Sequence, residues 1–238
     1  MFWRLVVSEV RGTLFRQKVL LTFLGLAVMD VWGIMTVADP DATFPFLLPL
    51  LLPFIVGDSL VRERHNSYSW LILTRGLSKF RYIACKMLGG VINCLVLTVA
   101  LTASFSLFGL LIRGTTIWIG SGATQLHPNL LIANPLLHAA AVVALVILSC
   151  IAVLGLTFVA STYTSSPYVA MSAPLLVILA LAFFLPSSWQ WLSPYERITF
   201  MITHQEWVNM INMTTYWLAM SGILYSWAIV KYIFTEGV

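Results

Sequence analysis

Six long apolar stretches constrain this sequence more than any other feature. A helix needs about 20 apolar residues to cross the roughly 30 Å hydrocarbon layer, where each backbone amide must be hydrogen-bonded within its own segment. The stretches run approximately over residues 19–37, 44–57, 87–112, 136–160, 168–185 and 214–230, and the second is expected to continue through Val61. Because only 9% of the residues are charged, against about 25% in soluble proteins, we predict an all-α integral membrane protein. Residues 1–238 would form a single transmembrane domain of six helices.

The positive charges predict how the chain lies in the membrane, because short cytoplasmic loops carry an excess of Lys and Arg. All but two of the 13 Lys and Arg residues lie in residues 1–18, in residues 58–86 or at Lys231, and the exceptions are Arg113 and Arg197. We therefore predict six crossings of the inner (cytoplasmic) membrane with both termini in the cytoplasm. The cations lie in patches between apolar runs rather than along one polar face, so no nucleic-acid partner is expected.

Two segments are amphipathic or aromatic enough to lie along the membrane surface. Residues 1–18 carry apolar side chains at helical spacing with cations on other faces, which predicts an interfacial amphipathic helix. Such a helix would be either a basic anchor attracted to anionic lipid or a lever connected to the first span. Residues 186–213 are too polar for a seventh span and too apolar for a simple loop. We predict one or two short re-entrant or interfacial helices there, between spans five and six, with an aromatic belt as the alternative.

The sequence offers little chemistry of its own. It has no glycine-rich phosphate loop ending in Lys and Ser or Thr, and no HExxH or GxSxG motif. Its three cysteines show no paired spacing, so neither a disulfide framework nor a zinc site is implied. We therefore expect no catalytic residue, metal site or cofactor on this chain. A Ser or Asp that meets its partner only in the fold keeps an intramembrane enzyme as one alternative.

Asp30 is the clearest ionisable residue inside a predicted span. A carboxylate at mid-span costs about 2.5–3.5 kcal/mol on insertion scales, so it should face the helix bundle or water rather than lipid. One interpretation places Asp30 on the translocation path, and the other places it near the outer end of a tilted helix. An ion-coupled transporter or channel usually carries several such residues, and this class is a second alternative.

Small residues recur along one face of the fourth predicted span and would allow another helix to approach closely. They are Ala141, Ala144, Ala152 and Gly155, with Leu148 between them. Packing within the chain and a subunit interface are both compatible with this face.

The segment between the second and third spans, residues 58–86, is charged at its start, apolar in its middle and basic at its end. That order is typical of a docking element, in which Trp70, Leu71 and Leu73 enter a groove on a cytoplasmic partner while the cations meet acidic groups or lipid phosphates. A basic interfacial helix explains the pattern equally well.

The residue order in this loop resembles that of the type-2 ABC exporter permeases. In those proteins the loop typically contains a Glu-Arg pair, a Gly-Thr-like pair, two spaced leucines, a Pro-x-Ser-like turn, a basic residue and a Lys that opens the third span. The matching residues are Glu63, Arg64, Ser67, Leu71, Leu73, Ser78, Lys79 and Lys86. Asn66 and Ser67 replace the Gly-Thr pair, and Gly76 stands where proline is common. The six-span plan and the predicted interfacial helices extend the resemblance over nearly the whole chain.

The resemblance implies a permease subunit of an exporter, which forms the translocation path for a hydrophobic or amphipathic substrate such as a lipid, peptide, glycan or drug. It also implies a second permease subunit, identical or similar, and a separate cytoplasmic ATP-binding subunit that carries ATP and Mg²⁺. That subunit would dock on the segment from Glu63 to Lys79. Because this chain has no phosphate loop of its own, ATP-driven transport would require such a partner.

Overall fold

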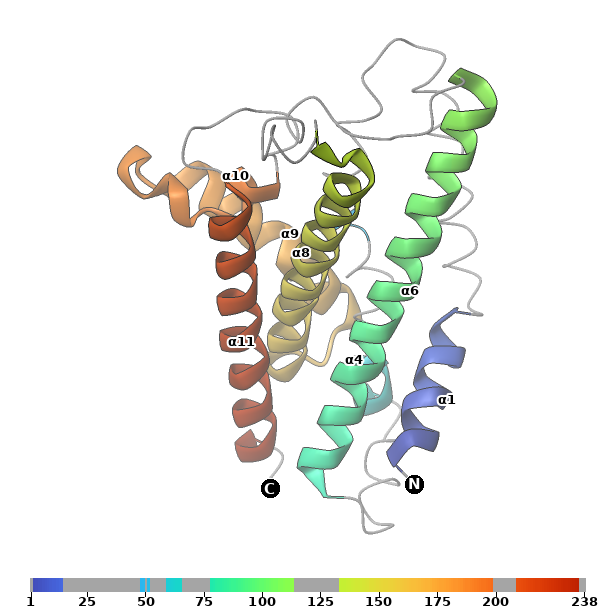
Figure 1. Cartoon of the computed structure of the whole chain (residues 1–238). Coiled ribbons are helices and arrows are strands. Elements are labelled where there is room, and N and C mark those ends of the chain that lie inside the picture. The colour runs from blue at the N-terminus through green and yellow to red at the C-terminus, as the bar shows by residue number, and fades with distance from the viewer. Residues whose placement is uncertain are drawn as a thin grey trace.

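The computed structural model describes residues 2–14, 48, 49, 51, 59–65, 78–113, 133–198 and 209–235. Within these ranges the chain is helical and contains no strand. Figure 1 shows long helices standing side by side, with α1 and the short helix α4 near the end at which both termini lie. The helices are α1 (Phe2–Leu14), α4 (Ser59–His65), α6 (Lys79–Arg113), α8 (Pro135–Tyr163), α9 (Pro167–Phe184), the 3-10 helix η2 (Ser187–Leu192), α10 (Pro194–Ile198) and α11 (Met210–Thr235).

Four of the described helices are long and apolar enough to cross a membrane. Their apolar windows are Lys79–Ser104 in α6, Leu136–Tyr163 in α8, Pro167–Phe184 in α9 and Met210–Phe234 in α11. These helices coincide with the third to sixth predicted spans, so the chain is a helical membrane protein. The first predicted span lies outside the described residues, and so does the second except for residues 48, 49 and 51. Six crossings therefore stay a prediction.

The helix α6 begins at Lys79, earlier than the predicted start of the third span. Three charged residues, Lys79, Arg81 and Lys86, lie in its first turns, and hydropathy alone therefore assigned these turns to the cytoplasmic loop. Ser78 starts the helix, because its Oγ accepts a hydrogen bond from the Arg81 amide at 3.4 Å and its carbonyl accepts one from the Tyr82 amide at 3.0 Å. The predicted loop at residues 58–86 is therefore helical at both ends, since α4 also lies within it.

A cap and a proline determine the connection between α8 and α9. The backbone of Thr164 is extended and its N–H donates to the Ala160 carbonyl at 3.2 Å, which ends α8. Pro167 is the first residue of α9, a position where its fixed φ and missing N–H suit a helix. Only residues 164–166 join the two helices, so α8 and α9 are antiparallel neighbours.

The helix α8 lies at the centre of the described part and packs on α6, α9 and, most extensively, α11. Gly155 allows this closest approach, because a Cβ added there would lie 3.1 Å from both the Leu224 Cβ and the Tyr225 ring. The Tyr225 hydroxyl donates to the Ile151 carbonyl at 3.1 Å. Gly155 therefore serves packing within the chain.

The other small residues predicted to line one face of this helix differ in burial. Ala152 is fully buried, whereas Ala141 is half-buried and Ala144 is exposed. The face therefore continues beyond the contact with α11, and a role of Ala141 and Ala144 in a subunit interface stays a prediction.

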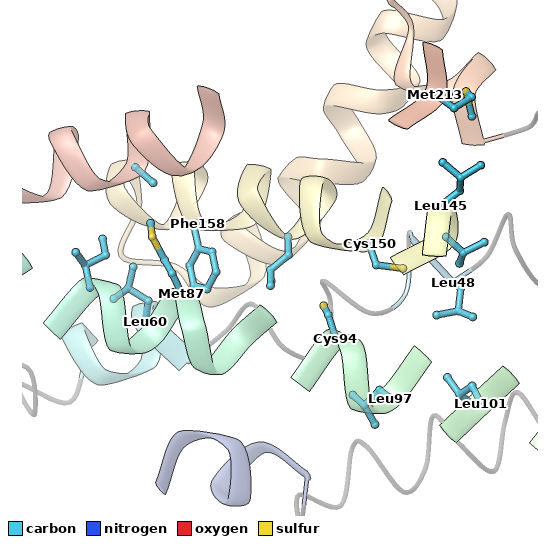
Figure 2. Close-up of a cluster of buried hydrophobic side chains, with 14 of the residues drawn as sticks. Leu48, Leu60, Met87, Cys94, Leu97, Leu101, Leu145, Cys150, Phe158 and Met213 are labelled. Carbon is cyan, nitrogen blue, oxygen red and sulfur yellow. The ribbon is translucent and has the colours of Figure 1, made fainter. Parts of the chain in front are cut away.

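The largest buried cluster joins α6, α8 and α11 and is shown in Figure 2. Cys94 of α6 and Cys150 of α8 point toward the same space in this cluster, and all three cysteines are buried and free. The Thr98 hydroxyl lies 4.0 Å from the Cys150 sulfur. These thiols fill the interior as small apolar groups, as their spacing in the sequence indicates.

The N-terminal helix α1 runs alongside the first half of α6 (Figure 1). It buries Val6 and Thr13 and exposes Trp3 and Val7. The Cys85 sulfur donates to the Phe2 carbonyl at 3.7 Å and holds the start of α1 against α6. The predicted helix is therefore present over Phe2–Leu14, while its position at the membrane interface stays a prediction.

Candidate functional site

Three helices that are far apart in the sequence meet at a single buried ammonium group. Lys86 of α6 forms ion pairs with Glu9 of α1 and with Glu63 of α4, and its Nζ lies 2.5 Å from the Glu63 Oε1. Only 8% of the Lys86 side chain is exposed. We call Glu9, Glu63, Tyr82 and Lys86 the inner ion cluster.

Tyr82 completes the hydrogen bonding of Glu63. Its hydroxyl donates to the Glu63 Oε2 at 2.6 Å, so both carboxylate oxygens have a partner. The Tyr82 ring stacks on Tyr232 of α11 with 5.9 Å between ring centroids and 29° between the ring planes. The inner ion cluster therefore contacts α11 as well as α1, α4 and α6.

The sequence around each partner explains how the cluster forms. In α4, Leu60 and Val61 are completely buried, and this anchors the helix that presents Glu63. On α6, Gly89 lies directly against Glu9, because a Cβ added at Gly89 would be 2.8 Å from the Glu9 Cγ. The missing side chain at Gly89 thus lets α1 approach closely enough for Glu9 to reach the ammonium group.

The energetics of this cluster favour rigidity. A buried ion pair gains little net stability over an apolar replacement, but removing one partner costs about 3–5 kcal/mol because a charge is left uncompensated. Lys86 has two such partners, and both lie in different helices. Relative movement of α1, α4 and α6 is therefore strongly disfavoured unless the ion pairs break.

The structure places some of the residues predicted to couple the chain to a partner. Glu63 lies in the inner ion cluster, Ser78 caps α6 and Lys79 is its first residue. Arg64 belongs to α4. The side chain of Arg64, all of Ser67, Trp70, Leu71 and Leu73, and Asp30 of the predicted translocation path lie outside the described residues.

Sequence reasoning did not identify Glu9. It is the only acidic residue among the first 18 residues, and an isolated acid on a basic amphipathic helix is a signal for a buried cationic partner. Lys86 was recognised only as the residue that opens the third span. Which acids surround it depends on the packing of α1 and α4.

A second buried cation organises the opposite end of the bundle. Arg197 of α10 donates to the Trp191 carbonyl of η2 from Nη2 at 2.9 Å and from Nε at 3.2 Å, and to the Asn212 carbonyl of α11 from Nη1 at 3.3 Å. Its guanidinium lies 4.5 Å from the centroid of the Tyr216 ring, and the Tyr216 hydroxyl donates to the Leu192 carbonyl at 2.9 Å. We call Arg197 and Tyr216, with the carbonyls they bind, the outer arginine cluster.

The guanidinium of Arg197 stays positively charged although the residue is buried. Loss of solvent lowers the pKa of the guanidinium, but arginine starts from a pKa above 12 and stays protonated in proteins. The short helices expected in residues 186–213 are present as η2 and α10, and whether they enter the membrane stays a prediction. Among the described residues, no group of three or more His, Cys, Asp or Glu side chains has the arrangement of a metal site.

Comparison with protein-family models and with curated proteins finds no match to this sequence. The resemblance to the type-2 ABC exporter permeases therefore rests on the order of residues from Glu63 to Lys86 and on the predicted six-span plan.

Proposed function

We propose that this chain is the permease subunit of an ATP-driven exporter and that the inner ion cluster transmits movement of a partner ATPase into the membrane. The observation that carries the proposal is the position of Glu63. This residue belongs to the predicted docking segment, and it is joined through Lys86 to α6 and to the N-terminal helix.

A docking segment transmits movement only if it is rigidly attached to the helices that must move. The Lys86 ammonium binds two carboxylates, and the Tyr82 hydroxyl binds the second oxygen of Glu63. Displacing α4 therefore either carries α1 and α6 along or separates the buried Lys86 from a partly buried carboxylate at a cost of about 3 kcal/mol, the lower end of the range for a buried ion pair. Under this proposal α1 acts as a lever, which is one of the two interpretations open from the sequence.

The remaining parts of the proposal follow the resemblance. ATP and Mg²⁺ would bind to the separate cytoplasmic subunit, and a second permease subunit would complete the translocation path. The substrate would be hydrophobic or amphipathic, in keeping with spans that expose mainly apolar side chains such as Leu176, Ile223 and Phe234.

The decisive experiment is affinity purification of the tagged chain from its native membrane, followed by identification of the bound proteins. We expect an ATP-binding subunit and a second permease subunit in the eluate. Transport of substrate by this chain in vesicles that contain no nucleotide-hydrolysing protein would contradict the proposal.

Docking is tested by Leu71→Ala in the predicted docking segment. We expect the variant to insert normally and to lose co-purification of the ATPase by about tenfold or more, as for a buried interface anchor. Leu136→Ala is the matched control, because Leu136 is an exposed leucine at the opposite end of the bundle. Equal retention of the ATPase by both variants would place the docking surface elsewhere.

The ion-coupled alternative makes the opposite energetic prediction. In that case Asp30→Asn would abolish flux and depletion of ATP would not, because an intramembrane carboxylate would carry the coupling ion. Under the proposed function, depletion of ATP stops transport whether residue 30 is Asp or Asn.

A further inference from the structure

The N-terminal helix α1 has one face that points away from the bundle. Arg4 and Arg11 lie at the centre of this face, where both are exposed and helical spacing places one above the other. Trp3 and Val7 lie beside them and are 66% and 61% exposed. Figure 1 shows α1 at the edge of the described helices, next to α6. We call Trp3, Arg4, Val7 and Arg11 the outer face of α1.

The inner ion cluster leaves the outer face of α1 purely basic. Glu9 is the only acidic residue of α1, and it points to the opposite side of the helix, where it pairs with Lys86. Val6 is buried on that same side. Among the described residues neither Arg4 nor Arg11 forms an ion pair. The outer face therefore carries two positive charges and no negative charge.

The chemistry of the outer face fits the surface of an anionic bilayer. Arginine places its guanidinium on phosphate oxygens while its apolar stem lies along neighbouring apolar groups, and tryptophan is typical of headgroup depth. The sequence predicts that this end of the bundle is cytoplasmic, and the cytoplasmic leaflet is the one with a negative surface potential. An acidic protein would account for the two arginines alone. The bilayer accounts for the arginines and for the exposed Trp3 and Val7 together.

We propose that the outer face of α1 binds anionic phospholipid headgroups and that this binding favours the position of α1 in which Glu9 pairs with Lys86. The bilayer and Lys86 then hold opposite faces of one helix, so each orients the helix for the other. Because linkage is reciprocal, lipid that binds the docked helix better than the undocked helix stabilises the docked position. The anchor and the lever, which are separate interpretations of the sequence, use opposite faces of α1.

The thiol of Cys85 reports whether α1 is docked. Cys85 is only 3% exposed, and its sulfur donates to the Phe2 carbonyl at 3.7 Å. Departure of α1 would uncover this thiol, whereas Cys94 and Cys150 are completely buried between α6 and α8. The rate at which a neutral maleimide labels Cys85, followed by mass spectrometry of the labelled peptide, therefore measures how often α1 undocks. This readout requires neither an ATPase nor transport, so it is independent of the proposed function.

The test uses the full-length purified protein in nanodiscs of phosphatidylcholine, with or without phosphatidylglycerol. We expect Cys85 to be labelled about fivefold more slowly, or slower still, when phosphatidylglycerol is present. That factor corresponds to the contribution of about one arginine near an anionic surface. The difference between the two bilayers should shrink as salt is added, because salt screens exposed charges.

Matched variants separate the outer face of α1 from general attraction of anionic lipid. The double variant Arg4→Gln/Arg11→Gln should be labelled at the same rate in both bilayers, to within about twofold, because its outer face has no charge left to attract lipid. Arg81→Gln is the control, because Arg81 is an exposed cation at the start of α6 and lies outside the outer face. We expect this control to keep the full effect of phosphatidylglycerol. All three substitutions are at exposed positions, where effects on folding are small.

Three results would overturn the proposal. The first is equal labelling of the wild-type protein in the two bilayers, which would leave an acidic protein surface as the partner of the outer face. The second is an undiminished effect of phosphatidylglycerol in the Arg4→Gln/Arg11→Gln variant. The third is the same loss of the lipid effect in Arg81→Gln as in the double variant, which would mean that any cation at this end attracts the lipid.

Discussion

The two ends of the described bundle each contain one buried cation, and the contacts that these two cations make within the described residues differ. Lys86 in the inner ion cluster pairs with two carboxylates from two other helices. Arg197 in the outer arginine cluster binds neutral backbone carbonyls of Trp191 and Asn212. The carboxylates that pair with Lys86 come from α1 and α4, whereas the carbonyls that accept hydrogen bonds from Arg197 come from η2 and the start of α11. The comparison indicates that the inner end couples distant segments and that the outer end caps neighbouring ones.

The largest expected effect comes from Lys86→Met. This change leaves the partly buried Glu9 and Glu63 close together without their cation, and we expect it to lower the free energy of unfolding by about 3 kcal/mol, the lower end of the range for breaking a buried ion pair. Thermal unfolding of the purified protein measures the loss. The variant that combines Lys86→Met with Glu9→Gln and Glu63→Gln should recover most of the stability, because it carries no unpaired charge. If the single and combined variants are equally unstable, charge pairing does not hold this end together.

Arg197→Met tests the other side of the comparison and should have a smaller effect. It leaves the Trp191 and Asn212 carbonyls without their donor, which we expect to cost about 2–3 kcal/mol. Hydrogen exchange should increase in η2, α10 and the start of α11 and stay unchanged in α1 and α4. Faster exchange in α1 would show that the two ends are coupled and would contradict the independence of the inner ion cluster from the outer arginine cluster.

Gly89→Ala tests whether the inner ion cluster depends on close contact between α1 and α6. The new methyl group would meet the Glu9 side chain at 2.8 Å, and we expect a loss of about 1–3 kcal/mol from overpacking. Gly12→Ala is the matched control, because nothing lies within 4 Å of a Cβ added at Gly12. That control should stabilise α1 by about 0.5–1 kcal/mol through helix propensity. Equal thermal stability of the two variants would argue against close packing at Gly89.

The smallest expected effect concerns Asn93, two turns beyond Lys86 on α6. Its side chain is fully buried, and within the described part of the chain neither its amide nitrogen nor its oxygen has a hydrogen-bond partner. Asn93→Leu should therefore stabilise the protein by about 1 kcal/mol, since an unsatisfied buried polar group is removed. A thermal shift measures the change. Destabilisation would mean that Asn93 has an interaction that extends the polar inner end further into the bundle.

Part of the candidate site was readable from the sequence. Glu63 and Lys86 were both recognised in the order of residues along the cytoplasmic loop, and a close helix approach was expected at Gly155. The partner of Gly155, α11, was not predicted, and Glu9 was not identified as a partner of Lys86. In each case the sequence indicates that a residue can make a contact, but it does not identify the distant residue on the other side of that contact.

The sequence by itself determined the apolar helices at α6, α8, α9 and α11 and the concentration of cations in residues 1–18, in residues 58–86 and at Lys231. The hydropathy of a segment and the charge of a loop depend only on residues that are neighbours in the sequence. Whether a segment can cross the membrane is therefore decided by its own residues. Only the tertiary structure decided that α1 packs on α6, that Glu9 and Glu63 share Lys86, and that Arg197 joins η2 to α11. Such pairings depend on which helices lie side by side. Neither the spacing of apolar residues along a helix nor its composition specifies which helix is its neighbour.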